Sequence, residues 1–110
     1  MANAYKNAKS VSLTTSLADI YTCPATTEAI VLGIQVANID GTNSADATVA
    51  WTDASDTDAV TYLIKSATVA AGQAIPALVD KIVLEAGDKI QAQASAAGDL
   101  ACTVAVLEIT

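Results

Sequence analysis

The chain has 110 residues, 53% of them hydrophobic, and its 12 acidic side chains against five basic ones give a formal net charge of −7. The length predicts one domain, the lack of a long apolar run excludes a membrane-spanning helix, and the apolar content argues against intrinsic disorder. The five Lys residues are scattered and the acidic surplus repels phosphate, so we expect neither nucleic acid nor a membrane as a partner.

The first nine residues are polar and follow no hydrophobic period. We therefore expect an extended N-terminal arm over residues 1–9 and a folded domain over residues 10–110. Tyr5 has no local apolar partner, and with Lys6 and Lys9 it makes the arm a candidate interaction segment that docks on a neighbouring subunit. The arm also lacks the apolar segment of a signal peptide, which predicts that the protein stays in the cytoplasm where it is made.

A period of two, typical of half-buried strands, recurs through the rest of the chain. It is strongest over residues 29–39, where Ile30, Leu32, Ile34 and Val36 share one face. Further strands are predicted over residues 11–17, 19–23, 47–52, 59–65, 67–70, 75–83, 88–95 and 100–107. Turn residues separate the runs about every ten positions, which predicts an all-β antiparallel sandwich or barrel of about eight strands.

The predicted core consists of the apolar residues on the inward face of these strands. Trp51 and Tyr62 are included because one aromatic side chain buries a large area, which leaves few aromatics to stack on a sugar. The core residues expected are Ile30, Leu32, Ile34, Val36, Val49, Trp51, Val60, Tyr62, Ile64, Leu84, Ile90, Val104 and Val106.

Asp53, Asp56 and Asp58 form the densest group of hard oxygen ligands, with Asp46 nearby. Ca²⁺ takes about six to eight oxygens, and an EF-hand needs a Gly at its sharp turn and a closing Glu, both of which this loop lacks. We favour a solvated hairpin loop and keep a structural Ca²⁺ site in the Asp53, Asp56 and Asp58 loop as the alternative.

The sequence offers no constellation for catalysis. It contains no His, no Ser stands in a GxSxG or SxxK context, and its Gly residues match neither a GxGxxG nor a P-loop pattern. Cys23 and Cys102 stand far apart without CxxC spacing, so we expect two buried reduced thiols, with a disulfide between them as the alternative. We predict no catalytic residue, no cofactor, no metal ligand and no enzymatic activity.

The segment LEAGDKI, residues 84–90, reads as a turn leading into a strand. Gly87 tolerates a positive φ and Asp88 can bond to its own turn.

Four segments together resemble a known group of proteins: IYTCPA at residues 20–25, VAN at residues 36–38, LEAGDKI at residues 84–90 and LEIT at residues 107–110. They are similar to short structural proteins of tailed bacteriophages, which include capsid cement (decoration) proteins and small tail or fibre components. The resemblance extends from about residue 10 to the end and implies a jelly-roll-like β-sandwich.

Further expectations follow from that resemblance. It implies a virion protein, preferably a cement protein that sits as a homotrimer over junctions between major capsid subunits and stabilises the assembled head. The alternative is a small tail, neck or tail-fibre component, including a receptor- or glycan-binding module. Its partners would be copies of itself and the major capsid protein or another virion protein, with the virion as its location.

Overall fold

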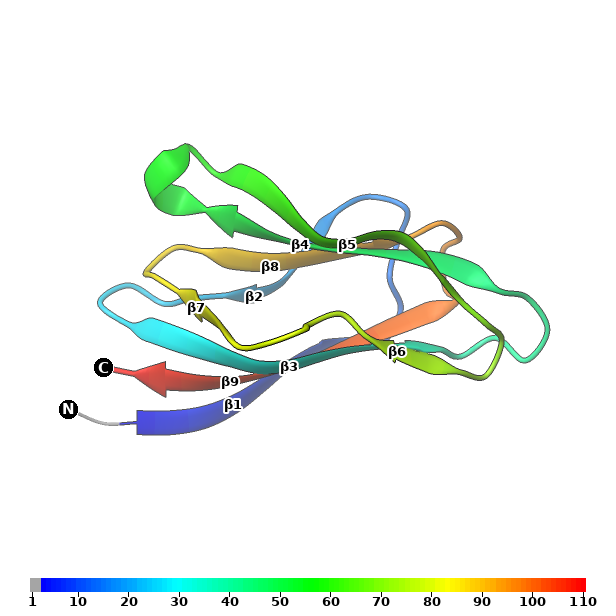
Figure 1. Ribbon diagram of the computed structural model, residues 1–110, viewed down its shortest axis with the longest axis horizontal. Helices are drawn as coiled ribbons and strands as arrows, with labels where there is room; N and C mark the ends of the chain where they lie inside the picture. The colour runs from blue at the N-terminus through cyan, green and yellow to red at the C-terminus, as the bar shows by residue number, and fades with distance from the viewer. Residues whose placement is uncertain (1–2) are drawn as a thin grey trace.

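A computed structural model describes residues 3–110 and is built almost entirely of β-strands (Figure 1). The only helical element among the described residues is a short 3-10 turn, η1 (Ala54–Asp56). The strands are β1 (Asn3–Ser10), β2 (Ala18–Thr22), β3 (Glu28–Asn38), β4 (Ala45–Asp53), β5 (Ala59–Val69), β6 (Ala74–Pro76), β7 (Ile82–Leu84), β8 (Lys89–Ala94) and β9 (Leu100–Ile109). Within this described part, no helix is long and apolar enough to cross a membrane.

The strands form two antiparallel sheets that pack as a sandwich. The first, sheet A, has the order β1-β9-β3-β6, with β7 pairing further along β3, and the second, sheet B, has the order β2-β8-β4-β5. Strands β1 to β4 alternate between the two sheets, which is the connectivity of a jelly roll. The predicted all-β antiparallel sandwich is therefore confirmed. Strand β1 begins and β9 ends at the same end of the molecule (Figure 1).

The core lies between the sheets and contains many alanines, so it is held by small side chains as well as by a few large ones. Its largest fully buried members include Leu13, Leu84, Ile90 and Leu100. Of the predicted core, seven residues are buried: Ile34, Val36, Val49, Leu84, Ile90, Val104 and Val106.

A β-bulge in β3 corrects the face predicted for this strand. Its pairing with β9 shifts register between Val31 and Gly33. Val31 is consequently 0% exposed and Ile34 3% exposed, whereas Leu32 is 39% exposed. A register change of one residue moves side chains to the opposite face, so Ile30 and Leu32, predicted in the core, point outward.

Strand β5 brings a second correction. It is the edge strand of sheet B, and its register places Tyr62 beside Ala50 and Val60 beside Thr52 on the outer face. Tyr62 and Val60 are 45% and 44% exposed, so neither belongs to the core. Trp51 and Ile64 are only partly buried and pack against the core from its margin.

Four predicted segments differ from the observed strands. Residues 11–17 form a connection, in which Leu13 is buried and its N–H donates to the Leu100 carbonyl at 2.7 Å. Residues 75–83 contain two short strands, β6 and β7, instead of one. Residues 59–65 and 67–70 belong to the single strand β5.

The segment predicted as an arm is a strand from Asn3 onward, and residues 1 and 2 lie outside the described part of the chain. Strand β1 pairs with β9 along its whole length, from Asn3 opposite Ile109 to Ser10 opposite Cys102. An edge strand can be held by backbone pairing alone, which explains why its sequence shows no hydrophobic period. The boundary between arm and domain at residue 9 therefore falls inside a strand of the sandwich.

Candidate functional site

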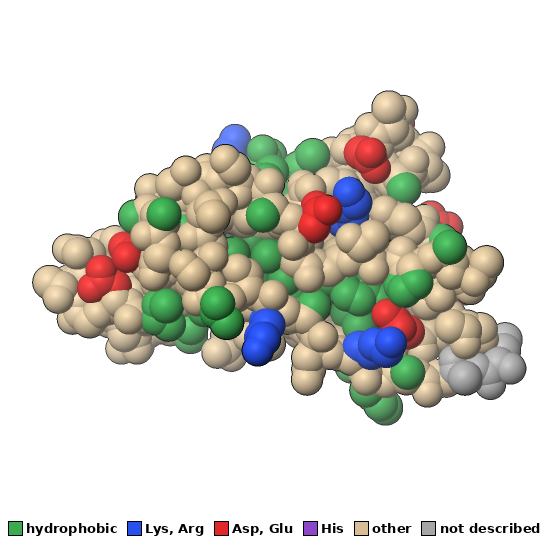
Figure 2. All heavy atoms as spheres, turned by 180° about the vertical axis from the view of Figure 1, so that it is seen from behind, with side chains coloured by type: hydrophobic (Ala, Val, Ile, Leu, Met, Phe, Trp, Pro, Cys, Tyr) green, Lys and Arg blue, Asp and Glu red, His purple; other side chains and the backbone are tan. Residues whose placement is uncertain are grey.

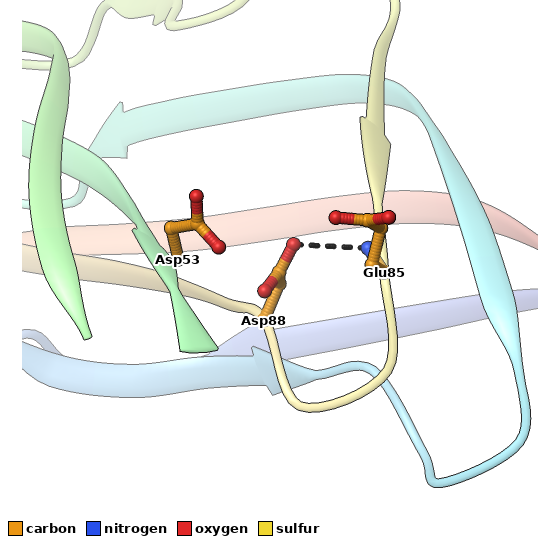
Figure 3. Close-up of side chains that lie close together, drawn as sticks. All are labelled: Asp53, Glu85 and Asp88. Carbon is orange, nitrogen blue, oxygen red and sulfur yellow. Dashed lines mark hydrogen bonds between the residues drawn. The ribbon is translucent and has the colours of Figure 1, made fainter. Parts of the chain in front are cut away.

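Three carboxylates meet at one end of the sandwich: Asp53 at the end of β4, and Glu85 and Asp88 in the turn between β7 and β8 (Figure 3). One oxygen from each lies within 4.8 Å of the others. Asp88 is buried, and its two oxygens accept hydrogen bonds from the backbone N–H groups of Ala54 and Glu85, both at 2.9 Å. These donors offset the repulsion among the three charges, so Asp88 ties the loop after β4 to the turn before β8.

The turn between β7 and β8 has the predicted geometry. Gly87 has φ +89°, a conformation that disfavours residues with a side chain. The N–H of Asp88 donates to the Glu85 carbonyl at 3.0 Å, while the Asp88 side chain accepts from the N–H of the same residue. The prediction that Asp88 bonds to its own turn is confirmed.

The grouping of Asp53, Asp56 and Asp58 expected from the sequence is not the one that forms. Asp53 turns toward Glu85 and Asp88, and its Oδ1 accepts from the backbone N–H of Ser55 at 3.0 Å. Asp56 and Asp58 are exposed in the hairpin loop. The set that could contact a cation is therefore Asp53, Glu85 and Asp88, which supplies few of the oxygens Ca²⁺ requires.

The three candidate residues of the N-terminal segment lie on different sides of β1. Tyr5, which is 78% exposed, and Lys9 point away from the sandwich, because Tyr5 pairs with Leu107 and Lys9 with Thr103 on the outer face. Lys6 reaches the buried Glu108, with 3.5 Å between its Nζ and Oε1. Lys6 therefore helps to attach β1, whereas Tyr5 and Lys9 are available to a partner.

Both cysteines are buried free thiols, as predicted. Burial raises the pKa of the Cys102 thiol to about 11. Burial, followed by the charge of Glu108, also raises the pKa of Cys23, whose Sγ lies 3.3 Å from the Thr27 carbonyl oxygen. Thiols that stay protonated are poor nucleophiles, so neither cysteine is poised for disulfide exchange.

The outer face of sheet B carries polar side chains beside the exposed Val60 and Tyr62. On sheet B, Asp19 pairs with Lys89 at 3.3 Å and accepts a hydrogen bond from Gln91 at 2.7 Å, so polar side chains satisfy one another. The hydrogen bond from Gln91, and to a lesser extent the contact with Lys89, lower the pKa of Asp19.

Sheet A presents an apolar row across four strands, with Tyr5 opposite Leu107, Leu107 opposite Ile30, and Ile30 opposite Val83. Tyr5 and Val83 are 78% and 61% exposed. In the space-filling view, hydrophobic side chains are exposed among the scattered charges of the face shown (Figure 2).

Hollows open on the surface of the described part of the chain. A groove of about 380 Å³ lies on the outer face of sheet A, lined by Gly33, Ile34, Gln35, Ala74, Ile75, Pro76, Thr103 and Ala105. These lining residues include no titratable or thiol group, and most of them are apolar. A wider hollow of about 480 Å³ adjoins the carboxylates and is lined by Thr26, Thr27, Glu28, Ser55, Glu85 and Ala86.

No family model and no curated protein matches the chain. Among solved structures, it is similar to a chain described under the words "Bacillus endospore appendages form a novel family of disulfide-linked pili", with a TM-score of 0.57 and 14% sequence identity. The alignment covers 99% of this chain and 87% of that one. The similarity shows that the two chains share the β-sandwich fold.

Proposed function

We propose that this chain is a structural subunit of a phage virion, a cement protein that binds the outside of an assembled capsid. Its activity is binding, and it carries out no chemistry. The observation that carries this proposal is the uncovered apolar row on sheet A, in which Tyr5 and Val83 are mostly exposed. Exposed apolar patches larger than roughly a few hundred Å² mark contacts with other proteins.

The energetics of a cement protein suit a small domain. A ligand that binds the assembled shell but not its free subunits stabilises the shell by mass action. Each copy needs only a modest interface, because many weak contacts repeated over a closed lattice add by avidity. With a net charge of −7, the chain is electrostatically complementary to Lys- or Arg-bearing loops of the major capsid protein. Added salt weakens such charge pairs where they lie at the solvent-exposed edge of the interface.

Reconstitution tests this function. Purified chain is added to capsids that lack it, and the capsid melting temperature is recorded at low and high salt. We expect a saturable rise in melting temperature that shrinks as salt increases. No rise, together with saturable binding to a host glycan, would contradict the cement role and favour a tail, neck or tail-fibre component.

The structural similarity to a pilus protein favours a second candidate, a subunit of a filament. That protein is described as disulfide-linked, whereas Cys23 and Cys102 here are both buried, so a filament of this chain would be held by noncovalent contacts. Electron microscopy of the concentrated protein, with and without reductant, distinguishes the filament candidate from the cement role. Filaments that survive reductant would support this candidate, and discrete particles would support the cement role.

A further inference from the structure

We propose that β1 exchanges between copies of this chain: it leaves β9 of its own domain and pairs, in the same register, with β9 of a neighbouring copy. The inference rests on the proposed function, because copies held close together on a capsid are the ones that exchange. It gives the expected N-terminal arm a defined docking site on the neighbouring subunit, namely the edge of β9 that β1 covers.

Strand β1 is held to the sandwich more loosely than the other long strands. Among strands longer than three residues in the described part of the chain, β1 is the one without a buried side chain, and only its Ala8 and Ser10 are half-buried. It is held by the backbone pairing with β9 and by the contact between Lys6 and Glu108. Segments with few buried apolar contacts open at a lower free-energy cost than the whole domain. β1 can therefore detach while the rest of the sandwich stays folded.

A hinge separates β1 from the part of the chain that stays in place. Leu13 is 2% exposed and its N–H donates to the Leu100 carbonyl at 2.7 Å, which fixes the chain at this residue. Only Val11 and Ser12 lie between Leu13 and Ser10, the last residue of β1 that pairs with β9. Val11 is 70% exposed, so it holds few contacts that a rotation would break. Changes in φ and ψ at these two residues are therefore sufficient to turn β1 away from its own domain.

The site that β1 leaves is suited to another copy of the same strand. Without β1, the edge of β9 is unpaired, and the carboxylate of Glu108, which is 7% exposed, has lost Lys6. A second β1 in the same register restores both the backbone hydrogen bonds and the contact of 3.5 Å between Lys6 and Glu108. A strand of unrelated sequence would restore the backbone hydrogen bonds alone. Because the contacts are the same within one chain and between chains, the local concentration of copies decides which form prevails.

Charge favours a second copy over the capsid as the partner of a detached β1. The strand carries Lys6 and Lys9 and no acidic residue. Residues 11–110 carry all 12 acidic side chains and three of the five Lys, so their net charge is −9. A basic strand is attracted to such a body and repelled by Lys- or Arg-bearing capsid loops.

The length of the strand is sufficient to reach a neighbour. Residues 3–12 span about 33 Å when extended. The two shorter dimensions of the molecule are 27 and 21 Å, so a copy that lies alongside is within reach. Exchange places Tyr5 of one copy opposite Leu107 of the next, where it completes the apolar row of that copy. The surface assigned to the capsid is then built from two copies, which links the cement subunits to one another.

Mixing two single-cysteine variants of the full-length chain tests the exchange. Asn7 lies opposite Ala105 in the register, and Ala105 lines the groove on the outer face of sheet A. Asn7→Cys and Ala105→Cys are incubated together in reductant at about 1 mM, within the range of effective concentrations that a short tether produces. The mixture is then diluted and oxidised, and mass spectrometry measures the disulfide between position 7 of one variant and position 105 of the other.

The matched control replaces Ala105→Cys with Val60→Cys, which is exposed on the outer face of sheet B, the sheet that β1 does not join. Opposite residues have Cβ atoms about 5 Å apart, close to disulfide geometry, so we expect about tenfold more mixed disulfide with Ala105→Cys than with Val60→Cys. Lys9→Cys with Thr103→Cys, the next pair along the strands, should behave in the same way. An excess at either pair supports the exchange, and yields equal to the control at both would overturn it.

Hydrogen exchange tests whether β1 opens on its own. In dilute protein, we expect the backbone amides of β1 that pair with β9 to exchange about a hundredfold faster than those of β3, which lies inside sheet A. Equal rates for the two strands would mean that β1 detaches only when the whole domain unfolds, which would also overturn the proposal.

The outcome is distinguishable from that of the proposed function. A chain that raises the capsid melting temperature but gives no excess of mixed disulfide would leave the cement role standing without strand exchange. A chain that gives the excess but does not raise the capsid melting temperature would leave strand exchange standing without the cement role.

Discussion

Tyr21 of β2 and Glu108 of β9 connect the two sheets through a hydrogen bond of 2.6 Å from the phenol hydroxyl to Oε2. Both residues are buried, and Lys6 of β1 lies 3.5 Å from the other carboxylate oxygen. Burial, followed by the hydrogen bond to Glu108, raises the pKa of Tyr21, so its hydroxyl remains a donor. This polar contact joins three strands, β1, β2 and β9, at the end of the sandwich where β1 begins and β9 ends.

Removing the Tyr21 hydroxyl should destabilise the fold. Tyr21→Phe leaves the buried Glu108 carboxylate with one fewer donor, which costs about 1.5–3 kcal/mol for a hydrogen bond to a charged group. The free energy of unfolding is measured by urea denaturation. Tyr62→Phe, at an exposed tyrosine on β5, is the control and should change stability by less than about 0.5 kcal/mol.

A double-mutant cycle with Glu108→Gln isolates this pair. We expect the two changes to be non-additive, since Tyr21→Phe removes the donor of this hydrogen bond and Glu108→Gln removes the charge of its acceptor. Strict additivity would mean that the pair contributes nothing to stability beyond packing.

The buried acids predict a loss of stability at alkaline pH. Burial raises the pKa of Cys102 to about 11, and the pKa of Tyr21 is raised as well. In the unfolded chain these groups ionise near their ordinary values, so the unfolded state loses protons first as the pH rises. The stability that these protonated groups confer is complete below about pH 8.5 and declines above it. For Cys102 the decline is over near pH 11, by which point the free energy of unfolding has fallen by about 3 kcal/mol.

Urea denaturation at a series of alkaline pH values checks this decline. Cys102→Ala should be less stable than the parent at neutral pH because it leaves a small cavity, yet it should lose less stability between neutral and alkaline pH. An equal slope for both proteins would contradict the assignment to this thiol.

Local patterns in the sequence predicted most of the strands and turns, but they missed β1 and did not predict the pairing between distant segments. The alternation through residues 100–107 and the glycine turn before Asp88 were predicted correctly, because each depends on neighbours within a few residues. The meeting of Asp53 with Asp88 depends on the register of β4 against β8, which no local pattern encodes. Gly33 was the available signal for the bulge in β3, since a glycine inside a strand often marks one.

The bulge in β3 predicts opposite outcomes for two residues that the alternation places on one face. Ile34→Ala should cost about 2–5 kcal/mol, because Ile34 is 3% exposed and its truncation leaves a cavity between the sheets. Leu32→Ala should cost less than about 1 kcal/mol, because Leu32 is 39% exposed at the bulge. Thermal and urea denaturation measure both. Equal costs would indicate that β3 is regular and that the shift between Val31 and Gly33 is absent.

Asp88 should matter more to stability than any exposed carboxylate of the chain. Asp88→Asn keeps the size of the side chain but replaces one acceptor oxygen with an NH₂ group that faces a backbone N–H donor. Both Asp88 oxygens accept such bonds, from Ala54 and from Glu85, so one contact is lost in either orientation of the amide. An unsatisfied buried donor costs about 1–3 kcal/mol, which sets the expected loss in urea denaturation.

Asp56→Asn, in the exposed hairpin loop, is the matched control and should stay within about 0.5 kcal/mol of the parent. If Asp88→Asn left the free energy of unfolding unchanged as well, the hydrogen bonds from Ala54 and Glu85 would not be what holds the two loops together. The size of the side chain, which Asn keeps, would then be sufficient for the geometry at this end of the sandwich.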